Sequence, residues 1–316
     1  MTIEKAFPAM GTVHTITIFD AEGPGAANDA RAYLLRLNQA WSCFQADSLI
    51  SRINRAAGVA PVAVDEDTFA VLQQARRYGG LTDGAFDVTV GPLAQLWREA
   101  MERRQLPADG DVWQALQLVD WRSILLDEKG QTAMLHRPGQ RIDLGGIAKG
   151  YAADGLRKFL RQHGVRRALL DLGGTVLSLG GRLPVGIRDP FRPAGAPMGT
   201  LMLEDRLAVT SGVYERFAWL GGHRYHHIVD PRTGYPSKSG LMSVTLVGEN
   251  GAALDALATA ALILGPERSV PLLTEQGMDA IFVTDQGQVL ITRGLKNEFR
   301  LTNKTNTMSD GQVSVA

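Results

Sequence analysis

The chain has 316 residues, of which 45% are apolar and 21% charged, a composition typical of globular proteins that bury a sizeable core. Its 33 Lys and Arg residues balance 33 Asp and Glu residues, so no overall basic field exists to hold nucleic acid. The single cysteine, Cys43, excludes intramolecular disulfides and zinc or iron–sulfur sites that need several cysteines.

Apolar periodicity predicts strands and helices along most of the chain. In chain order, strands are predicted at residues 12–19, 166–172, 184–188, 207–210, 225–229, 243–247, 280–284 and 288–292. Helices are predicted at residues 26–41, 65–78, 91–104, 252–264 and 266–276. The last two strands flank Asp285-Gln286-Gly287, which predicts a β-hairpin. Because hairpins and helices are mixed without a regular βαβ series, we expect an α+β (mixed α/β) fold.

No Pro/Ser-rich linker or internal repeat divides the sequence. We therefore expect one domain over residues 1–303, followed by a loose tail over residues 304–316, which are polar and aperiodic. No apolar run reaches the roughly 18–20 residues that span a membrane. The sequence as written carries no signal peptide, so a cytoplasmic location is expected, or a periplasmic or membrane-anchored one if the true start lies upstream.

Residues 141–152 combine features of an anion-binding turn. Asp143 ends a predicted strand, two glycines follow, and Lys149 lies in the opening turn of a helix. Free N–H groups at a helix start, together with a cation, bind anions. The order of residues is not that of a Walker A loop, and no G-x-G-x-x-G follows a strand, which disfavours a Rossmann dinucleotide site. A sharp strand-to-helix turn with a solvated lysine would explain this segment equally well.

Asp255 and Thr259 lie four residues apart in an apolar helix and therefore share one face. Both supply oxygen, the ligand atom that Mg²⁺ prefers, and a buried carboxylate is costly unless it is paired or metal-bound. The alternative is an Asp near a helix N-terminus and a Thr hydroxyl bonded back to a carbonyl.

Two further segments carry polar groups with open roles. His226 and His227 are adjacent in a predicted strand, so they point to opposite faces and only one can face a given site. This favours a general base or hydrogen-bond donor over a metal ligand, with a structural histidine as the alternative. In residues 82–93, two carboxylates and Phe86 surround a glycine turn, which is either a stacking site for a flat ring or a capped turn.

The combination and order of these motifs make the chain resemble the ApbE family of FAD:protein FMN transferases, also called flavin transferases. The resemblance runs from about residue 9 to about residue 295, nearly the whole chain. The matching segments are Ala9-Met10-Gly11-Thr12, Phe44-Gln45-Ala46-Asp47-Ser48 with Asn54, and residues 82–93 (TDGAFDVTVGPL), 143–152 (DLGGIAKGYA), 171–174 (DLGG), 185–190 (VGIRDP), 210–212 (TSG), 227–236 (HIVDPRTGYP) and 255–259 (DALAT).

The resemblance implies an enzyme that cleaves FAD at its pyrophosphate with Mg²⁺. The FMN half is attached through a phosphoester to a Thr or Ser of an acceptor flavoprotein, and AMP leaves. The implied acceptor is a respiratory or reductase subunit. Two alternatives remain open: a Mg²⁺-dependent FAD pyrophosphatase that uses water as acceptor, and a non-catalytic flavin carrier.

The resemblance also implies roles for individual residues. Asp255, Thr259 and the main-chain oxygen of Gly146 would bind Mg²⁺. Lys149 would contact phosphate, with Asp143 orienting it, and His227 would lie beside the diphosphate and activate the acceptor hydroxyl. The residues implied to line the flavin and adenosine pocket are Met10, Phe44, Ala85, Phe86 and Asp87. Three further candidates near the site are Thr210, Ser211 and Arg188.

Overall fold

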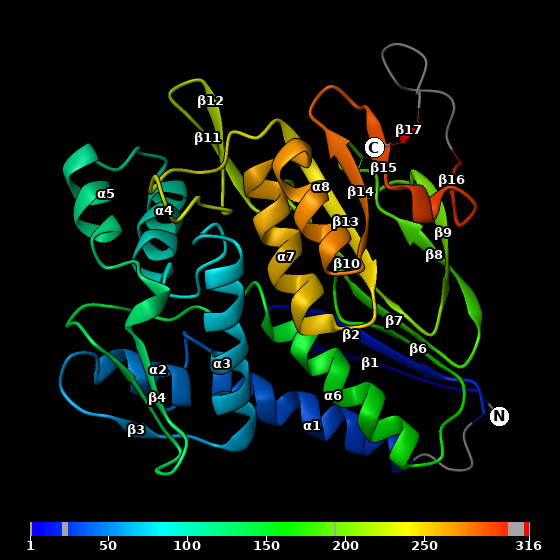
Figure 1. Cartoon of the computed structure of the whole chain (residues 1–316), viewed down its shortest axis with the longest axis horizontal. Helices are drawn as coiled ribbons and strands as arrows, with labels where there is room; N and C mark the ends of the chain where they lie inside the picture. Colours follow the sequence, from blue (N-terminus) through cyan, green and yellow to red (C-terminus); the bar gives the residue numbers. More distant parts are fainter. Residues whose placement is uncertain (1, 21–24, 193, 303–312, 316) are drawn as a thin grey trace. The chain divides into compact units, whose positions relative to one another are not determined.

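The largest element of the fold is a nine-stranded, mostly antiparallel sheet (Figure 1). This computed structural model describes residues 2–20, 25–192, 194–302 and 313–315. The chain forms two compact units, each assembled from separate stretches of sequence. The first, here called the sheet unit, comprises Met1–Leu35, Lys149–Tyr214 and Ser239–Ala316. The second, here called the helical unit, comprises Arg36–Ala148 and Glu215–Lys238.

The strands of the large sheet are antiparallel to their neighbours except for the last pair, β15 and β17, which is parallel. In spatial order they are β1 (Ile3–Ala9), β2 (Thr12–Ile18), β6 (Ala168–Asp171), β7 (Thr175–Leu179), β10 (Leu207–Gly212), β13 (Leu241–Gly248), β14 (Asp279–Thr284), β15 (Val289–Ile291) and β17 (Val313–Val315). All eight positions of β13 are buried, which explains why its sequence is a nearly continuous apolar run rather than an alternating one.

A smaller sheet shares a core with the large one. Its strands are β16 (Phe299–Leu301), β9 (Gly199–Glu204) and β8 (Arg182–Ile187), in that spatial order. Leu201 and Phe299 from this sheet join Ile281 and Val283 of β14 in one hydrophobic cluster. Burial of this cluster fixes the two sheets against each other within the unit.

Helices cover the large sheet, as Figure 1 shows for α7 in front of β10 and β13. The helices of this unit are α1 (Gly25–Trp41, in this unit up to Leu35), α6 (Ala148–Gln162), α7 (Gly251–Leu264), α8 (Pro266–Glu275) and the short η2 (Arg293–Leu295). The Asn250 side chain caps α7 by accepting from the Ala253 N–H. Every residue of α7 from Gly251 to Ile263 is buried except Thr259, as expected for a helix that is apolar on all sides.

The helical unit is built around Trp97. Its helices are α2 (Leu49–Arg55), α3 (Glu66–Leu81), α4 (Gly91–Arg103), α5 (Asp109–Leu116) and η1 (Trp121–Ser123). Its strands are β3 (Val62–Ala63), β5 (Thr132–Leu135) and β4 (Ile124–Asp127) in one sheet, and β11 (Phe217–Leu220) and β12 (His223–His226) in a hairpin. The Trp97 indole donates to the Gly234 carbonyl (2.8 Å), stacks on Tyr225 (5.3 Å between centroids) and meets Tyr235 edge-on. Trp97 thereby fastens the hairpin and the turn that follows it to α4.

The predicted mixed α/β fold is confirmed, and the boundaries of most predicted elements agree within a few residues. The strand predicted at residues 225–229 instead ends at His226. Beyond it the main chain takes other partners: the Ile228 N–H donates to His226 Nδ1 (3.3 Å), and Val229 forms an isolated bridge with Pro236. Of the predicted tail, residues 304–312 and 316 lie outside the described residues, whereas Val313–Val315 form β17. The single-domain boundary stays a prediction. In the described part of the chain, no helix has the length and apolar character to cross a membrane.

Candidate active site

Helices α6 and α7 cross at two glycines, immediately beside Lys149. The Gly150 N–H donates to Asp255 Oδ2 (2.9 Å), so the first turn of α6 holds the carboxylate on α7. One turn along α6, the carboxylate of Asp154 accepts from the N–H groups of Gly251 (2.8 Å) and Ala252 (3.0 Å) and caps α7. Each helix therefore positions a carboxylate or N–H group for the other.

We expect Gly150→Ala to lower the free energy of unfolding by roughly 2 kcal/mol, the usual size of an overpacking penalty. A Cβ on Gly150 would lie 2.0 Å from the Gly251 carbonyl oxygen and 2.7 Å from Asp255 Cβ, so the helices would have to separate. The measurement is urea-induced unfolding. Gly110→Ala in α5 is the control: its Cβ meets nothing within 4 Å, and helix propensity alone should stabilise by roughly 0.5–1 kcal/mol. Equal stability of the two variants would contradict the close crossing.

The expected magnesium ligands of α7 lie together with a third oxygen group. Asp255 is 4% exposed, and the Thr259 hydroxyl lies 3.2 Å from the Ser211 hydroxyl of β10. Thr259 Oγ1 also donates to the Asp255 main-chain oxygen (3.3 Å), which is the back-bond expected of a helical threonine. The hydroxyl keeps lone pairs for a further partner. Near these residues, Thr210 bonds to Thr245 (2.8 Å), whereas Arg188 is exposed just after β8.

This donor set fits magnesium better than a transition metal. In the described residues, no group of three or more His, Cys, Asp or Glu side chains could hold a metal ion. One buried carboxylate with hydroxyl oxygens is the set that Mg²⁺ accepts, since it completes its octahedron with water, main-chain oxygens and substrate phosphates. The residues present on α7 and β10 therefore fit the ion that the family resemblance implies.

His14 of β2 is a buried histidine near Lys149 that sequence reasoning did not single out. Its side chain is fully buried, and its ring lies 5.9 Å from that of Phe7 on β1. Burial and the positive charge of Lys149 lower the pKa of His14 from 6.5 to about 4, although Asp171 opposes the shift. A neutral imidazole is thus maintained next to the cation that begins α6.

The lowered pKa of His14 predicts a loss of stability in acid. The unfolded chain takes up this proton near pH 6.5 and the folded chain only near pH 4, so the free energy of unfolding falls as the pH is lowered between these values. The expected slope is up to about 1.4 kcal/mol per pH unit, or about 2 kcal/mol from pH 6.5 to 5. Urea unfolding at these two pH values should show this loss in the native protein and not in His14→Gln. An unchanged pH dependence in the variant would contradict the shift.

In the helical unit, side-chain hydrogen bonds hold the glycine turn that precedes α6. Both amide atoms of the Asn54 side chain bond to the main chain of Ile142, at 3.0 and 2.7 Å. Asp143 donates its own N–H to Val88 O (2.8 Å) and accepts from the Gly145 N–H through Oδ1 (2.8 Å). The Asp143 carboxylate therefore shapes the glycine turn. A role for Gly146 as a ligand to a shared cation stays a prediction.

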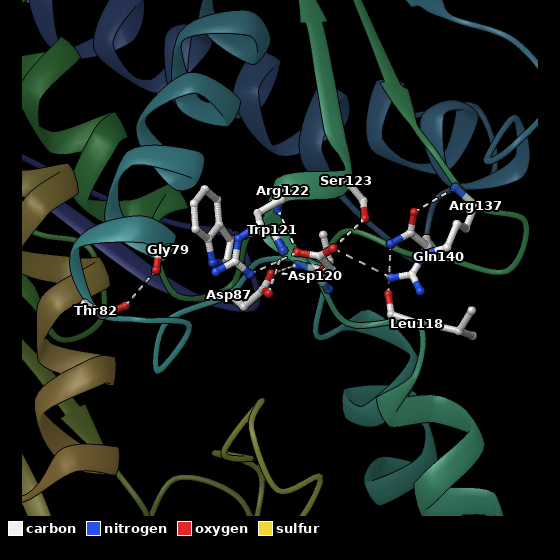
Figure 2. A network of polar contacts seen from close by, with 11 residues as sticks. Gly79, Thr82, Asp87, Leu118, Asp120, Trp121, Arg122, Ser123, Arg137 and Gln140 are labelled. Atoms are coloured by element: carbon white, nitrogen blue, oxygen red, sulfur yellow. Dashed lines mark hydrogen bonds and ion pairs between the residues drawn. The ribbon is translucent and has the colours of Figure 1, made fainter.

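Asp87 holds a loop together with both carboxylate oxygens (Figure 2). Its Oδ1 accepts from the N–H and the hydroxyl of Thr89 (2.7 Å each), and its Oδ2 accepts from the Trp121 N–H (2.8 Å). The Thr89 hydroxyl accepts from the Asp120 N–H (2.8 Å), and Asp120 in turn accepts from the Ser123 hydroxyl (3.3 Å). Burial raises the pKa of Asp87 to about 6 despite these bonds. The carboxylate thus acts within the protein, as the capped-turn alternative expects.

The same turn borders a cavity of about 340 Å³. The side chains of Ala85 and Phe86 are buried, so a ligand contact from them would come from the main chain. The cavity is lined by Asp83, Gly84, Asp87, Leu116, Gln117, Val119, Asp120, Trp121, Arg122, Arg137, Pro231 and Arg232. The Arg122 guanidinium lies 4.6 Å from the Trp121 ring centroid, and Arg232 is held by the Asp230 carboxylate at 2.9 and 2.8 Å. The sequence patterns singled out neither Trp121 nor Arg232.

The two adjacent histidines face different surroundings. His226 is buried, its pKa is lowered to about 4 by burial and by neighbouring positive charge, and its Nε2 meets the Ser237 carbonyl. His227 is half-buried, and its Nδ1 lies 3.2 Å from the Arg216 carbonyl oxygen. A carbonyl can only accept, so Nδ1 carries the proton and Nε2 is the basic nitrogen of His227. The two rings therefore differ in burial and partners, and the role of His227 in a reaction stays a prediction.

Two candidate flavin contacts have unusual surroundings. Met10 and Gly11 form the two-residue turn between β1 and β2, with φ of 47° and 77°. A positive φ is uncommon for methionine, and such strain tends to occur at functional sites. Phe44 is 71% exposed, and the Arg98 guanidinium lies 4.7 Å from its ring centroid. An exposed aromatic ring with one face held by a cation is available to stack on a flat ligand.

Comparisons with known proteins identify the family of the chain. The model of the ApbE family matches residues 10–282. A protein of Klebsiella pneumoniae (strain 342) named FAD:protein FMN transferase is 39% identical over 249 residues, 78% of each chain. A protein of the same name from Treponema pallidum (strain Nichols) is 34% identical over 320 residues, 94% of this chain and 88% of the relative.

Solved structures show that the fold of this chain is also similar to that of ApbE proteins. The crystal structure of the ApbE protein from Thermotoga maritima matches with a TM-score of 0.85 at 31% identity, covering 94% of this chain and 98% of that one. The flavin transferase ApbE from Vibrio cholerae matches with a TM-score of 0.79 at 25% identity, covering 95% and 96%. The chain therefore belongs to the ApbE family and is an enzyme of the transferase class.

Proposed function

We propose that the protein is an FAD:protein FMN transferase that depends on Mg²⁺, attaches FMN to a Thr or Ser hydroxyl of an acceptor protein and releases AMP. The observation that carries the proposal is the crossing of α6 and α7, where the N–H next to Lys149 holds the Asp255 carboxylate at 2.9 Å. The family match supplies the reaction class, and this crossing supplies a cation and an oxygen donor set of the kind that phosphoryl transfer requires.

We assign the magnesium ion to Asp255 and Thr259, with the Gly146 carbonyl as a further ligand. When bound, Mg²⁺ would neutralise charge on the diphosphate oxygens. Lys149, at the N-terminal end of α6, would bind a phosphate through its ammonium group, and the dipole of the helix favours the same anion. Ser211 would orient the Thr259 hydroxyl, which lies 3.2 Å away.

His227 would act as the general base. Its Nδ1 proton is directed at the Arg216 carbonyl, so Nε2 can accept the proton of the acceptor hydroxyl. The hydroxyl oxygen then bonds to the phosphorus of the FMN half, the pyrophosphate P–O bond breaks, and AMP leaves with the bonding electron pair. We place Met10, Phe44 and the main chain at Ala85–Asp87 beside the flavin and adenosine rings, and expect a redox flavoprotein subunit as acceptor.

The test uses the purified protein with FAD, Mg²⁺ and a soluble test acceptor that bears an exposed Ser/Thr-Gly-Ala-Thr stretch. AMP release is followed by chromatography and the mass of each intact protein by mass spectrometry. AMP together with an FMN-sized mass gain on the acceptor supports the transferase. AMP with free FMN and no adduct would support a pyrophosphatase instead. Bound FAD without AMP would leave a carrier, and the role of His227 would be withdrawn.

A further inference from the structure

The β11–β12 hairpin carries two aromatic side chains that are partly exposed to solvent. Phe217 is 47% exposed and Trp219 is 66% exposed, and because they are two residues apart in β11 they share one face. The cross-strand partner of Trp219 is Arg224, whose guanidinium lies 4.3 Å from the Phe217 ring centroid. On the other face, Tyr225 stacks on Trp97. One face of the hairpin is therefore anchored in the core, and the other is an apolar surface bordered by a cation.

The hairpin also has no third strand among the described residues. Within the described residues, β11 and β12 pair only with each other, as a two-stranded sheet. An unpaired strand edge offers main-chain donors and acceptors to an added extended segment. Aromatic side chains beside such an edge supply the anchoring contacts that dominate protein–protein binding.

The base of the hairpin lies at the proposed general base. His227 directly follows β12, and its N–H donates to the carbonyl oxygen of Arg216, the residue before β11 (3.1 Å). Trp219 is three residues from Arg216, about 10 Å along an extended strand. A polypeptide lying on the aromatic face can thus reach from Trp219 to His227 with only three or four of its own residues.

We propose that the exposed face of β11–β12, formed by Phe217, Trp219 and Arg224, is the docking surface for the acceptor protein. The inference rests on the proposed transferase function and names the place where its protein substrate binds. The acceptor contributes an extended segment that packs apolar side chains on the two rings and brings its hydroxyl to His227. Arg216 and Arg224 favour a segment that carries carboxylates. A protein fits better than a membrane surface, because a polypeptide can pair with a strand edge that has no third strand.

The test compares Trp219→Ala, and Phe217→Ala with Trp219→Ala, against Trp113→Ala. Trp113, on α5, is 63% exposed and lies outside the hairpin, so it is a matched control. FMN transfer to the test acceptor is measured as a function of acceptor concentration, and FAD affinity is measured by flavin fluorescence. We expect the double variant to raise the KM for the acceptor by 10-fold or more, with kcat at saturating acceptor and FAD affinity unchanged. Trp219→Phe should restore most of the loss, and Trp113→Ala should have no effect.

An acceptor KM that stays within twofold of the native value in the double variant would overturn the docking surface. If that variant also lost binding to anionic phospholipid vesicles, the face would be assigned to a membrane. If it instead had a lower molar mass in solution than the native protein, the face would be assigned to contact with a second copy of the chain. Failure of the native protein to transfer FMN at all would instead refute the proposed function.

Discussion

Asp255→Ala should reduce Mg²⁺-dependent turnover by roughly 1,000-fold, the equivalent of losing several kcal/mol of transition-state stabilisation. Asp255 supplies the only carboxylate in the proposed ligand set, and it is buried where water cannot replace it. The variant should remain folded, because it leaves only the Gly150 N–H without its acceptor, at a cost of about 1–3 kcal/mol. The measurement is AMP release at increasing Mg²⁺ concentration, with circular dichroism as the check on folding.

Two further variants sharpen this experiment. Asp255→Asn keeps an oxygen for the Gly150 N–H and removes the charge, so it should fold like the native protein and still lose turnover. Glu275→Ala removes an exposed carboxylate at the end of α8 and should leave turnover unchanged. A folded Asp255→Ala that retained more than a tenth of the native rate, with an unshifted requirement for Mg²⁺, would refute the metal assignment.

His227→Gln should slow FMN transfer by roughly 100- to 10,000-fold, the range that general base catalysis contributes. Glutamine can still donate to the Arg216 carbonyl, so the base of the hairpin should be preserved while the basic Nε2 is lost. Transfer to the test acceptor should be measured over a range of pH. The native rate should fall in acid as Nε2 becomes protonated, and this fall should disappear in the variant.

His223→Gln provides the comparison for His227. His223 lies in the same hairpin, is exposed, and has no place in the proposed reaction, so its replacement should leave the rate and the pH profile unchanged. FAD affinity should be native in both variants. If His227→Gln transferred FMN at the native rate with the native pH profile, another group would have to be the base.

Short sequence patterns predicted those features of the candidate site that lie within one helix or turn. The spacing of Asp255 and Thr259 correctly placed both on one helix. The adjacency of His226 and His227 predicted opposite faces of one strand, but β12 ends at His226, so His227 lies outside the strand. The same patterns left open whether Asp87 serves a ligand or a turn, and the structure shows its carboxylate bonded to Thr89 and Trp121. Its partner Trp121 lies 34 positions away, beyond what a turn motif can specify.

Contacts between distant segments were not predictable in the same way. No sequence pattern singles out Asp154, yet it caps α7, because two glycines allow α6 and α7 to approach closely. His14 lies in an alternating strand and is fully buried, because the large sheet is covered at that position. The hairpin strand β11 was not predicted, since four residues with two bare aromatics do not show the alternation of a half-buried strand.

The crossing of α6 and α7 also bears on how the protein folds. Its hydrogen bonds join residues 105 and 97 positions apart, so they form only after a long stretch of chain has closed on itself. We expect these contacts to be absent from the folding transition state. A cation bound at Asp255 would then slow unfolding without speeding folding. During synthesis, the chain would have no competent magnesium site until α7 had left the ribosome and packed against α6.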